Sequence, residues 1–264
     1  MHAHALERYE SRDSLLHALD PRVKVLLTFL FIISTSMLPD GAWWAFVASW
    51  AFLWLATYLA RFTMAFVLRR SVIALPFALA AVTLLFTVPG PALLSWQVGG
   101  RALTISEPGL VRFAGVMTRS WLSVQMAILL TASTPFPDLM HALRHLRVPH
   151  VLIAIIGFMY RYLFVLADEA RRLLRAREAR SAAPAPGAGG SSLLWRARVA
   201  GNMVGTLFLR SMERSERVYN AMVARAYRGR LLTLTPHAMA RRDWLATVVA
   251  LLLFAAIQAL GRIL

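Results

Sequence analysis

The stretch GAWWAFVASWAFLWLATYLA, residues 41–60, decides the fold class of this chain. Its twenty residues carry no charge, and about twenty apolar residues in an α-helix suffice to cross the hydrocarbon core of a bilayer. Further apolar stretches lie at residues 21–38, 71–88, 113–133 and 244–261. The sequence therefore predicts an all-α integral membrane protein with about five transmembrane helices.

The composition favours a membrane protein whose charges gather on one side. Of the 264 residues, 58% are hydrophobic, yet the formal net charge is +16, and soluble domains rarely combine the two. The chain has no cysteine, which excludes disulfides, iron–sulfur clusters and thiolate zinc sites. We expect no cleavable signal peptide, because residues 1–13 are polar and the apolar run after Lys24 lacks a small-residue cleavage pattern.

Basic residues predict the topology, since the cytoplasmic loops of membrane proteins collect arginine and lysine. They flank the start of the first predicted span and occupy the loop at residues 61–70, whereas the loops near Asp40 and Arg101 hold few. The N-terminus is therefore predicted to lie inside. If residues 151–167 crossed as well, the fifteen arginines of residues 171–242 would lie outside. We therefore expect residues 149–181 to form a long helix under or within the inner leaflet that does not span.

This topology divides the chain into three regions. They are an N-terminal membrane part with four transmembrane helices at residues 1–134, a cytoplasmic region at residues 135–242 and a C-terminal transmembrane helix at residues 243–264. Within the cytoplasmic region, the long helix is followed by SAAPAPGAGGSS, residues 181–192. Prolines, glycines and small residues in such a run are typical of a flexible turn.

A second long helix is predicted over residues 193–227, with two features of helix packing. Gly201 and Gly205 stand four residues apart and predict a point where another helix crosses closely. Gly229 is the expected residue just beyond the helix end. Apolar and small residues also recur at spacings of four and three, which predicts a packing seam made of Phe208, Met212, Ser215, Tyr219, Met222 and Ala226.

The same small triplet stands near the end of both long helices, as Ala179-Arg180-Ser181 and as Ala224-Arg225-Ala226. A single arginine at a helix C-terminus is commonly explained by the helix dipole and by the arginine bias of inner loops. The pair suggests more, because small flanking side chains let a helix end enter a groove while the guanidinium protrudes and makes bidentate contacts. We call these two arginine-bearing helix ends plugs. Two similar plugs predict a partner with two similar binding grooves, or sockets, which would be a homodimer or a pseudo-symmetric dimer.

The sequence offers no catalytic, cofactor-binding or metal-binding group. A P-loop needs lysine after glycine, and the single lysine, Lys24, follows valine. His141 and His145 could share a metal, but without a third ligand nearby they are more typical of surface histidines. Two other function classes stay open: a membrane-embedded enzyme acting on anionic lipid, and a membrane adaptor that binds nucleic acid through its arginines.

Three stretches resemble a known family. LDPRVKVLLT at residues 19–28, the EARS and VARAYRG helix ends, and RSMERSERVYNAMVAR at residues 210–225 are similar to the transmembrane T component of energy-coupling-factor importers, most closely the cobalt branch of CbiQ type. The resemblance implies a non-catalytic subunit with two crossed amphipathic coupling helices. It also implies that Arg180 docks into one of two cytoplasmic ABC-type ATPase subunits and Arg225 into the other. The chain departs from the family at Ala226, where glycine is usual.

The resemblance further implies that ATPase motions pass through the crossed helices to a substrate-binding membrane subunit. That subunit would be CbiM-like, possibly with a small CbiN-like companion, and the importer would lie in the bacterial inner membrane. The cargo implied is cobalt, with nickel or another metal or vitamin as the alternative, and the chain itself would hold no cofactor and bind no nucleic acid. The face expected to contact the substrate-binding subunit consists of Val151, Ile155, Phe158 and Tyr162.

Overall fold

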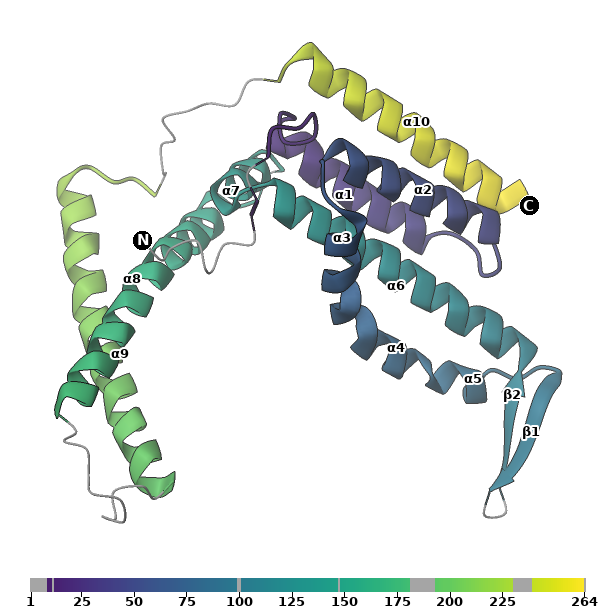
Figure 1. The fold of residues 1–264 in the computed structure, drawn as a ribbon. Coiled ribbons are helices and arrows are strands. Elements are labelled where there is room, and N and C mark those ends of the chain that lie inside the picture. The colour runs from purple at the N-terminus through teal and green to yellow at the C-terminus, as the bar shows by residue number, and fades with distance from the viewer. Residues whose placement is uncertain are drawn as a thin grey trace. The chain divides into compact units, whose positions relative to one another are not determined.

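The computed structural model describes residues 9–10, 12–98, 101–146, 148–180, 193–229 and 239–263. These residues form two compact units, Met1–His145 with Thr235–Leu264, and Leu146–Leu234. The borders differ from the predicted regions because α7 (Phe136–His145) packs against α1 (Pro21–Ser36) in the first unit. Figure 1 shows the elements of each unit.

The first unit is built from helices, as predicted for the class. Beside α1 and α7 it contains α2 (Trp43–Leu59), α3 (Met64–Arg70), the 3-10 helix η2 (Ser71–Ala74), α4 (Leu75–Ala81), α5 (Thr83–Thr87), α6 (Glu107–Ser133) and α10 (Arg241–Ile263). The sequence did not predict the antiparallel hairpin of β1 (Ala92–Val98) and β2 (Arg101–Ser106). The assignment to all-α membrane proteins is nevertheless confirmed.

Capping residues set where the long helices begin. Asp20 accepts the backbone N–H of Arg22 at 2.9 Å and Pro21 occupies the first turn, so α1 starts where the sequence predicted. At α6, the Ser106 hydroxyl accepts the backbone N–H of Gly109 at 3.1 Å. This cap starts α6 six residues before the predicted residue 113, because a search for apolar residues alone overlooks a polar first turn.

The third predicted span, residues 71–88, is not one continuous helix. The structure breaks it into η2, α4 and α5, although it does end where expected, with Val88 extended after α5. Pro76 accounts for the first break, since proline lacks a backbone N–H and its ring clashes with the carbonyl four residues earlier. The prediction of an unbroken third span is therefore wrong.

Three of the described helices are long and apolar enough to cross a membrane: α6, α10 and α8 (His150–Arg180) of the second unit. A fourth candidate is the pair formed by α2 and Met64–Ala74, which bends by 117°. The predicted count of five rests partly on α1 and α2, which have 16 and 17 residues. Length and composition admit α8 as a span, so its assignment to the cytoplasmic side rests on the arginine distribution and stays a prediction.

The core of the first unit lies where α1, α2, α6 and α10 pack together (Figure 1). The Phe31 ring lies 5.5 Å from Phe52 and 5.8 Å from Phe254, so one aromatic cluster joins α1, α2 and α10. Gly261 of α10 packs closely against the side chains of Leu38 and Ala45. A Cβ atom there would lie 2.7 Å from the Leu38 side chain, so only glycine fits without a shift.

A buried polar cluster at the start of α1 ties this bundle together. Asp243, only 2% exposed, accepts the backbone N–H groups of Asp20 at 3.0 Å and of Ala240 at 2.8 Å. It thereby bonds the first turn of α10 to the cap of α1. The Lys24 ammonium donates to the Ser133 carbonyl at 3.3 Å and satisfies the end of α6.

The segment before α1 packs around His17. Its Nε2 lies 3.1 Å from the Glu10 carbonyl and its Nδ1 lies 2.6 Å from the Ser14 hydroxyl. We infer that Nε2 carries the proton, because a carbonyl can only accept. The ring also lies 5.6 Å from Phe62. Burial lowers the pKa of His17 below its ordinary value of 6.5.

The second unit consists of α8 and α9 (Leu193–Ala224), which pack against each other and cross (Figure 1). The predicted bounds of α8 are confirmed to within one residue, whereas α9 ends three residues before the predicted residue 227. The intervening run 181–192 lies outside the described residues.

The predicted seam of α9 meets α8 in part, since Met212, Ser215 and Met222 line the groove between the two helices. Phe208 is 59% exposed and Tyr219 is 58% exposed. The less exposed positions of α9 include Met222 of the predicted seam, and otherwise Met203, Leu207, Ser211, Arg214 and Val218, which lie outside it. Hydrophobic periodicity therefore located part of the face toward α8 and not all of it.

Candidate functional site

The end of α9 is a complete Schellman motif centred on the predicted plug. Arg225 follows the last helical residue, and Ala226 has the positive φ of +60° that this motif requires. The backbone N–H of Ala226 donates to the Val223 carbonyl at 2.9 Å, and that of Tyr227 donates to the Met222 carbonyl at 3.0 Å. Ala226, and not the predicted Gly229, is therefore the left-handed residue that ends the helix.

Alanine is an unfavourable residue at this position, because an L side chain in the left-handed region costs about 1–2 kcal/mol. The motif recurs in the first unit at the end of α2, where Arg61 has φ +58°. There the backbone N–H groups of Arg61 and Phe62 donate to the carbonyls of Tyr58 and Thr57. The chain thus ends two helices in the same geometry without glycine.

Tertiary packing holds the end of α9 in place. The Tyr227 ring meets the Phe158 ring of α8 edge-on, with 6.4 Å between the centroids. Because Tyr227 immediately follows the left-handed residue, this contact fixes the direction in which the chain leaves the helix. Ala224 and Arg225 both stay exposed, so the guanidinium of Arg225 protrudes from an anchored end with small neighbours.

The other predicted plug lies at the last turn of α8. Ala179 and Arg180 are the last residues of α8 and both are exposed. Ser181, the third member of the triplet, lies outside the described residues. Each of the two long helices therefore ends in an exposed arginine beside a small residue, as the sequence predicted for this pair.

An ion pair that the sequence analysis missed joins the two helices. Glu169 of α8 accepts a hydrogen bond from Arg210 of α9 at 2.7 Å and lies 3.2 Å from Arg172. The hydrogen bond from Arg210 lowers the pKa of the Glu169 carboxyl, which stays ionised. The two partners lie 41 residues apart in the chain, so no local spacing pattern reveals the pair.

The four residues predicted to contact a substrate-binding subunit lie along α8 but differ in exposure. Val151 and Ile155 are exposed. Phe158 and Tyr162 are half-buried and line an apolar groove of about 370 Å³ between α8 and α9. One helical stripe is therefore open at its N-terminal half and partly covered by α9 further along.

The two glycines predicted as a helix crossing do not contact α8. A Cβ atom added to Gly201 or to Gly205 would meet no heavy atom of the described chain within 4 Å. The contacts of α8 with α9 and its end lie instead at Glu169 with Arg210 and at Phe158 with Tyr227. As the crossing point within this chain, the glycines are therefore a wrong prediction.

The histidine pair lies in the first unit. The rings of His141 and His145 are 4.9 Å apart, and Arg22 lies within 3.0 Å of the His141 Nε2. Among the described residues no group of three or more possible ligands for a metal ion occurs.

The chain is similar to known proteins over most of its length. The sequence profile of a family described as CbiQ, cobalt transport protein, matches residues 12–236. The cobalt transport protein CbiQ of Rhodobacter capsulatus is 28% identical over 60% of this chain, and the match spans 62% of that protein, less than two thirds of its length. The energy-coupling factor transporter transmembrane protein EcfT of Clostridium kluyveri is 26% identical over 93% of this chain and 92% of that protein. The EcfT protein of Lacticaseibacillus paracasei is 28% identical over 91% of this chain and 92% of its own length.

Proposed function

This chain belongs to the CbiQ family of cobalt transport proteins, and from that premise we propose that it is the non-catalytic coupling subunit of an ATP-driven importer. The observation that supports this proposal is the pair of exposed arginines, Arg180 and Arg225, at the ends of two helices that pack across each other. Its relatives are transmembrane components of energy-coupling factor transporters. The implied partners are two cytoplasmic ATPase subunits and a substrate-binding membrane subunit.

In this mechanism each arginine docks into one ATPase subunit. A guanidinium is always charged and can make bidentate contacts to carboxylates, so we expect acidic groups in both sockets. When ATP binding closes the ATPase dimer, the two sockets move relative to each other. The rigid ends of α8 and α9 then change the angle at which the helices cross.

The crossing transmits this motion to the substrate-binding subunit. The exposed Val151 and Ile155, continued by Phe158 and Tyr162 in the groove, form the contact surface in this proposal. Apolar contact suits a moving interface, because hydrophobic attraction is non-directional and survives sliding. The cargo we propose is cobalt, in keeping with the name of the family. Nickel or another substrate is the alternative, since selectivity would reside in the partner that binds the cargo.

Co-purification tests the docking arginines. The double variant Arg180→Ala/Arg225→Ala should lose the ATPase subunits, because truncating one partner of a buried, hydrogen-bonded charge pair costs about 2–5 kcal/mol of binding. The matched control is Arg175→Ala/Arg228→Ala, which removes two exposed arginines near the same helix ends. Undiminished ATPase recovery with the first variant would refute the docking assignment. Uptake of radioactive cobalt by cells with the intact importer, with nickel as competitor, tests the cargo.

We also propose that the chain lies in the bacterial inner membrane with its N-terminus and α8 on the cytoplasmic side. Because the chain has no cysteine, single cysteines report topology without background. A membrane-impermeant thiol reagent added to intact spheroplasts should label Pro39→Cys, in the loop before α2, and leave Arg175→Cys, in α8, unlabelled. Labelling of Arg175→Cys from outside would show that α8 crosses the membrane.

A further inference from the structure

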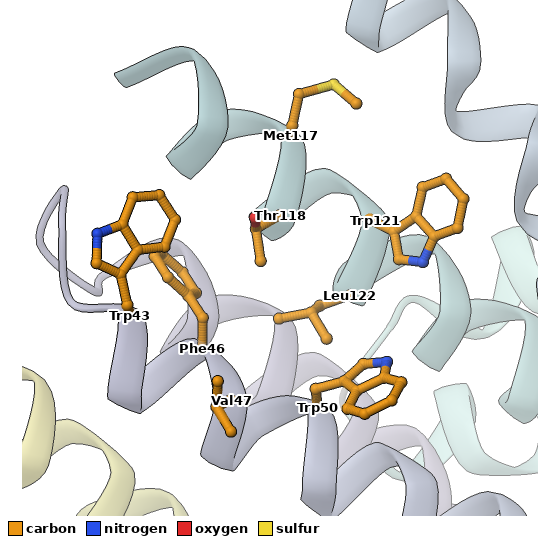
Figure 2. A pocket seen from close by; sticks show the side chains of 8 residues that line it. All are labelled: Trp43, Phe46, Val47, Trp50, Met117, Thr118, Trp121 and Leu122. Atoms are coloured by element: carbon orange, nitrogen blue, oxygen red, sulfur yellow. The ribbon is translucent and has the colours of Figure 1, made fainter. Parts of the chain in front are cut away.

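An apolar groove of about 380 Å³ lies between α2 and α6 of the first unit (Figure 2). Trp43 and Trp50 of α2 and Trp121 of α6 line it, and the buried Leu122 lies between them. The groove is a feature of the membrane part, because α6 and the α2 pair are candidate spans. We therefore expect its walls to face hydrocarbon.

A charged cluster adjoins this groove at the loop between α1 and α2. Arg119 donates to the Asp40 carboxylate at 2.7 Å and to the Leu38 carbonyl at 2.7 Å. Its guanidinium carbon also lies 5.8 Å from the centre of the Phe46 ring, which lines the groove. The Nε of Arg112 lies 3.4 Å from the same carboxylate.

This cluster carries an excess of one positive charge, because a single carboxylate faces two guanidinium groups. Arg119 is mostly covered, with 20% of its side chain exposed, whereas Arg112 is 58% exposed. Both guanidinium groups share the Asp40 carboxylate, and that of Arg112 is the one more open to a further anion at the surface. Tryptophans beside such a charge are typical of the boundary between hydrocarbon and lipid headgroups.

We propose that this groove binds one anionic glycerophospholipid, with an acyl chain between α2 and α6 and its phosphate at Arg112. The apolar walls match a hydrocarbon chain, and the charge excess matches a headgroup that carries a net negative charge. An apolar helix of a partner protein would fill the walls but leave the excess positive charge of the cluster unneutralised. The charge is what favours lipid over a partner helix.

Native mass spectrometry of the full-length chain, released from nanodiscs of equal parts phosphatidylglycerol and phosphatidylcholine, tests this proposal. The chain should retain one phosphatidylglycerol molecule. Val47→Trp, which fills the groove, should lower this retention at least about fivefold. The matched control is Val249→Trp on α10, because Val47 and Val249 are 57% and 55% exposed. The control should retain lipid as the wild type does.

A second pair of variants tests the headgroup contact. Arg112→Gln should reduce the preference for phosphatidylglycerol over phosphatidylcholine by roughly fivefold, the effect of one arginine near an anionic group. Arg262→Gln, an exposed arginine at the end of α10, should leave the preference unchanged. Equal lipid retention by the two tryptophan variants would overturn the proposal, as would an unchanged preference in Arg112→Gln. A photo-crosslinker at Val47 that captures a protein in intact membranes would overturn it too.

Discussion

Replacing Ala226 by glycine should stabilise the end of α9, which is unusual for an alanine-to-glycine change. Alanine at φ +60° costs about 1–2 kcal/mol that glycine avoids. Glycine loses more backbone entropy on ordering, which offsets about 0.5–1 kcal/mol. Ala226 is exposed, so its methyl group contributes little packing. The net expectation is a gain of about 0–1.5 kcal/mol, and its midpoint corresponds to a factor of about four in the opening equilibrium.

Amide hydrogen exchange measures this equilibrium directly. The backbone N–H groups of Ala226 and Tyr227 both donate within the motif, so their exchange should slow by that factor in Ala226→Gly. Ala221→Gly is the matched control, since Ala221 is an exposed residue inside α9. There glycine costs about 1 kcal/mol and should speed exchange at the helix end.

The same alanine-to-glycine change should thus slow amide exchange at the helix end when made at Ala226 and speed it when made at Ala221, five positions earlier. Only a left-handed conformation at Ala226 explains opposite effects of the two substitutions. If both variants speed exchange, Ala226 is helical in solution and the reasoning is refuted. The functional consequence follows from the same number. If only the capped end enters the ATPase, Ala226→Gly should raise the apparent affinity for that subunit by no more than about fourfold.

Three further predictions concern polar contacts. Asp243→Ala should lower the free energy of unfolding of the detergent-solubilised chain by about 2–4 kcal/mol, because it leaves two backbone N–H groups unpaired. Asp168→Ala, at an exposed site, should leave the free energy of unfolding unchanged. Equal melting temperatures of the two variants in differential scanning fluorimetry would contradict this prediction. Since the pKa of His17 is lowered in the folded state, the stabilising effect of His17 is present above pH 6.5 and is lost as the pH falls through the lowered pKa. The unfolding midpoints of the wild type and of His17→Gln should therefore converge on acidification. A difference between the two midpoints that does not change with pH would contradict this. Glu169→Gln should broaden the distance distribution between spin labels on α8 and α9, and the charge-swapped Glu169→Arg/Arg210→Glu should narrow it again. The control Glu213→Gln, which removes an exposed pair within α9, should leave the distribution unchanged. Because the pKa of Glu169 is lowered, the pair persists below the ordinary carboxyl range, and the wild type should show the same broadening only in stronger acid.

Signals local in the chain predicted much of the architecture. The apolar stretch at residues 21–38 predicted the start of α1, and the helix predicted over residues 149–181 agrees with α8 to within one residue. Two misplaced boundaries also had visible signals. Pro76 marks the break in the third predicted span, and Ser106 followed by Pro108 marks the true start of α6. These errors arose because hydropathy was given more weight than capping and proline chemistry.

The sequence by itself determined the membrane class, the long helices and the two arginine-bearing ends, because hydropathy, helix propensity and capping act between residues close together in the chain. Only the tertiary structure decided which stripe of α9 meets α8, that Glu169 pairs with Arg210, and that Ala226 adopts a left-handed conformation beside Tyr227 and Phe158. Those features depend on the register between two helices. Register is set by packing and by single charge pairs between residues distant in the chain, and no periodicity within one helix encodes it.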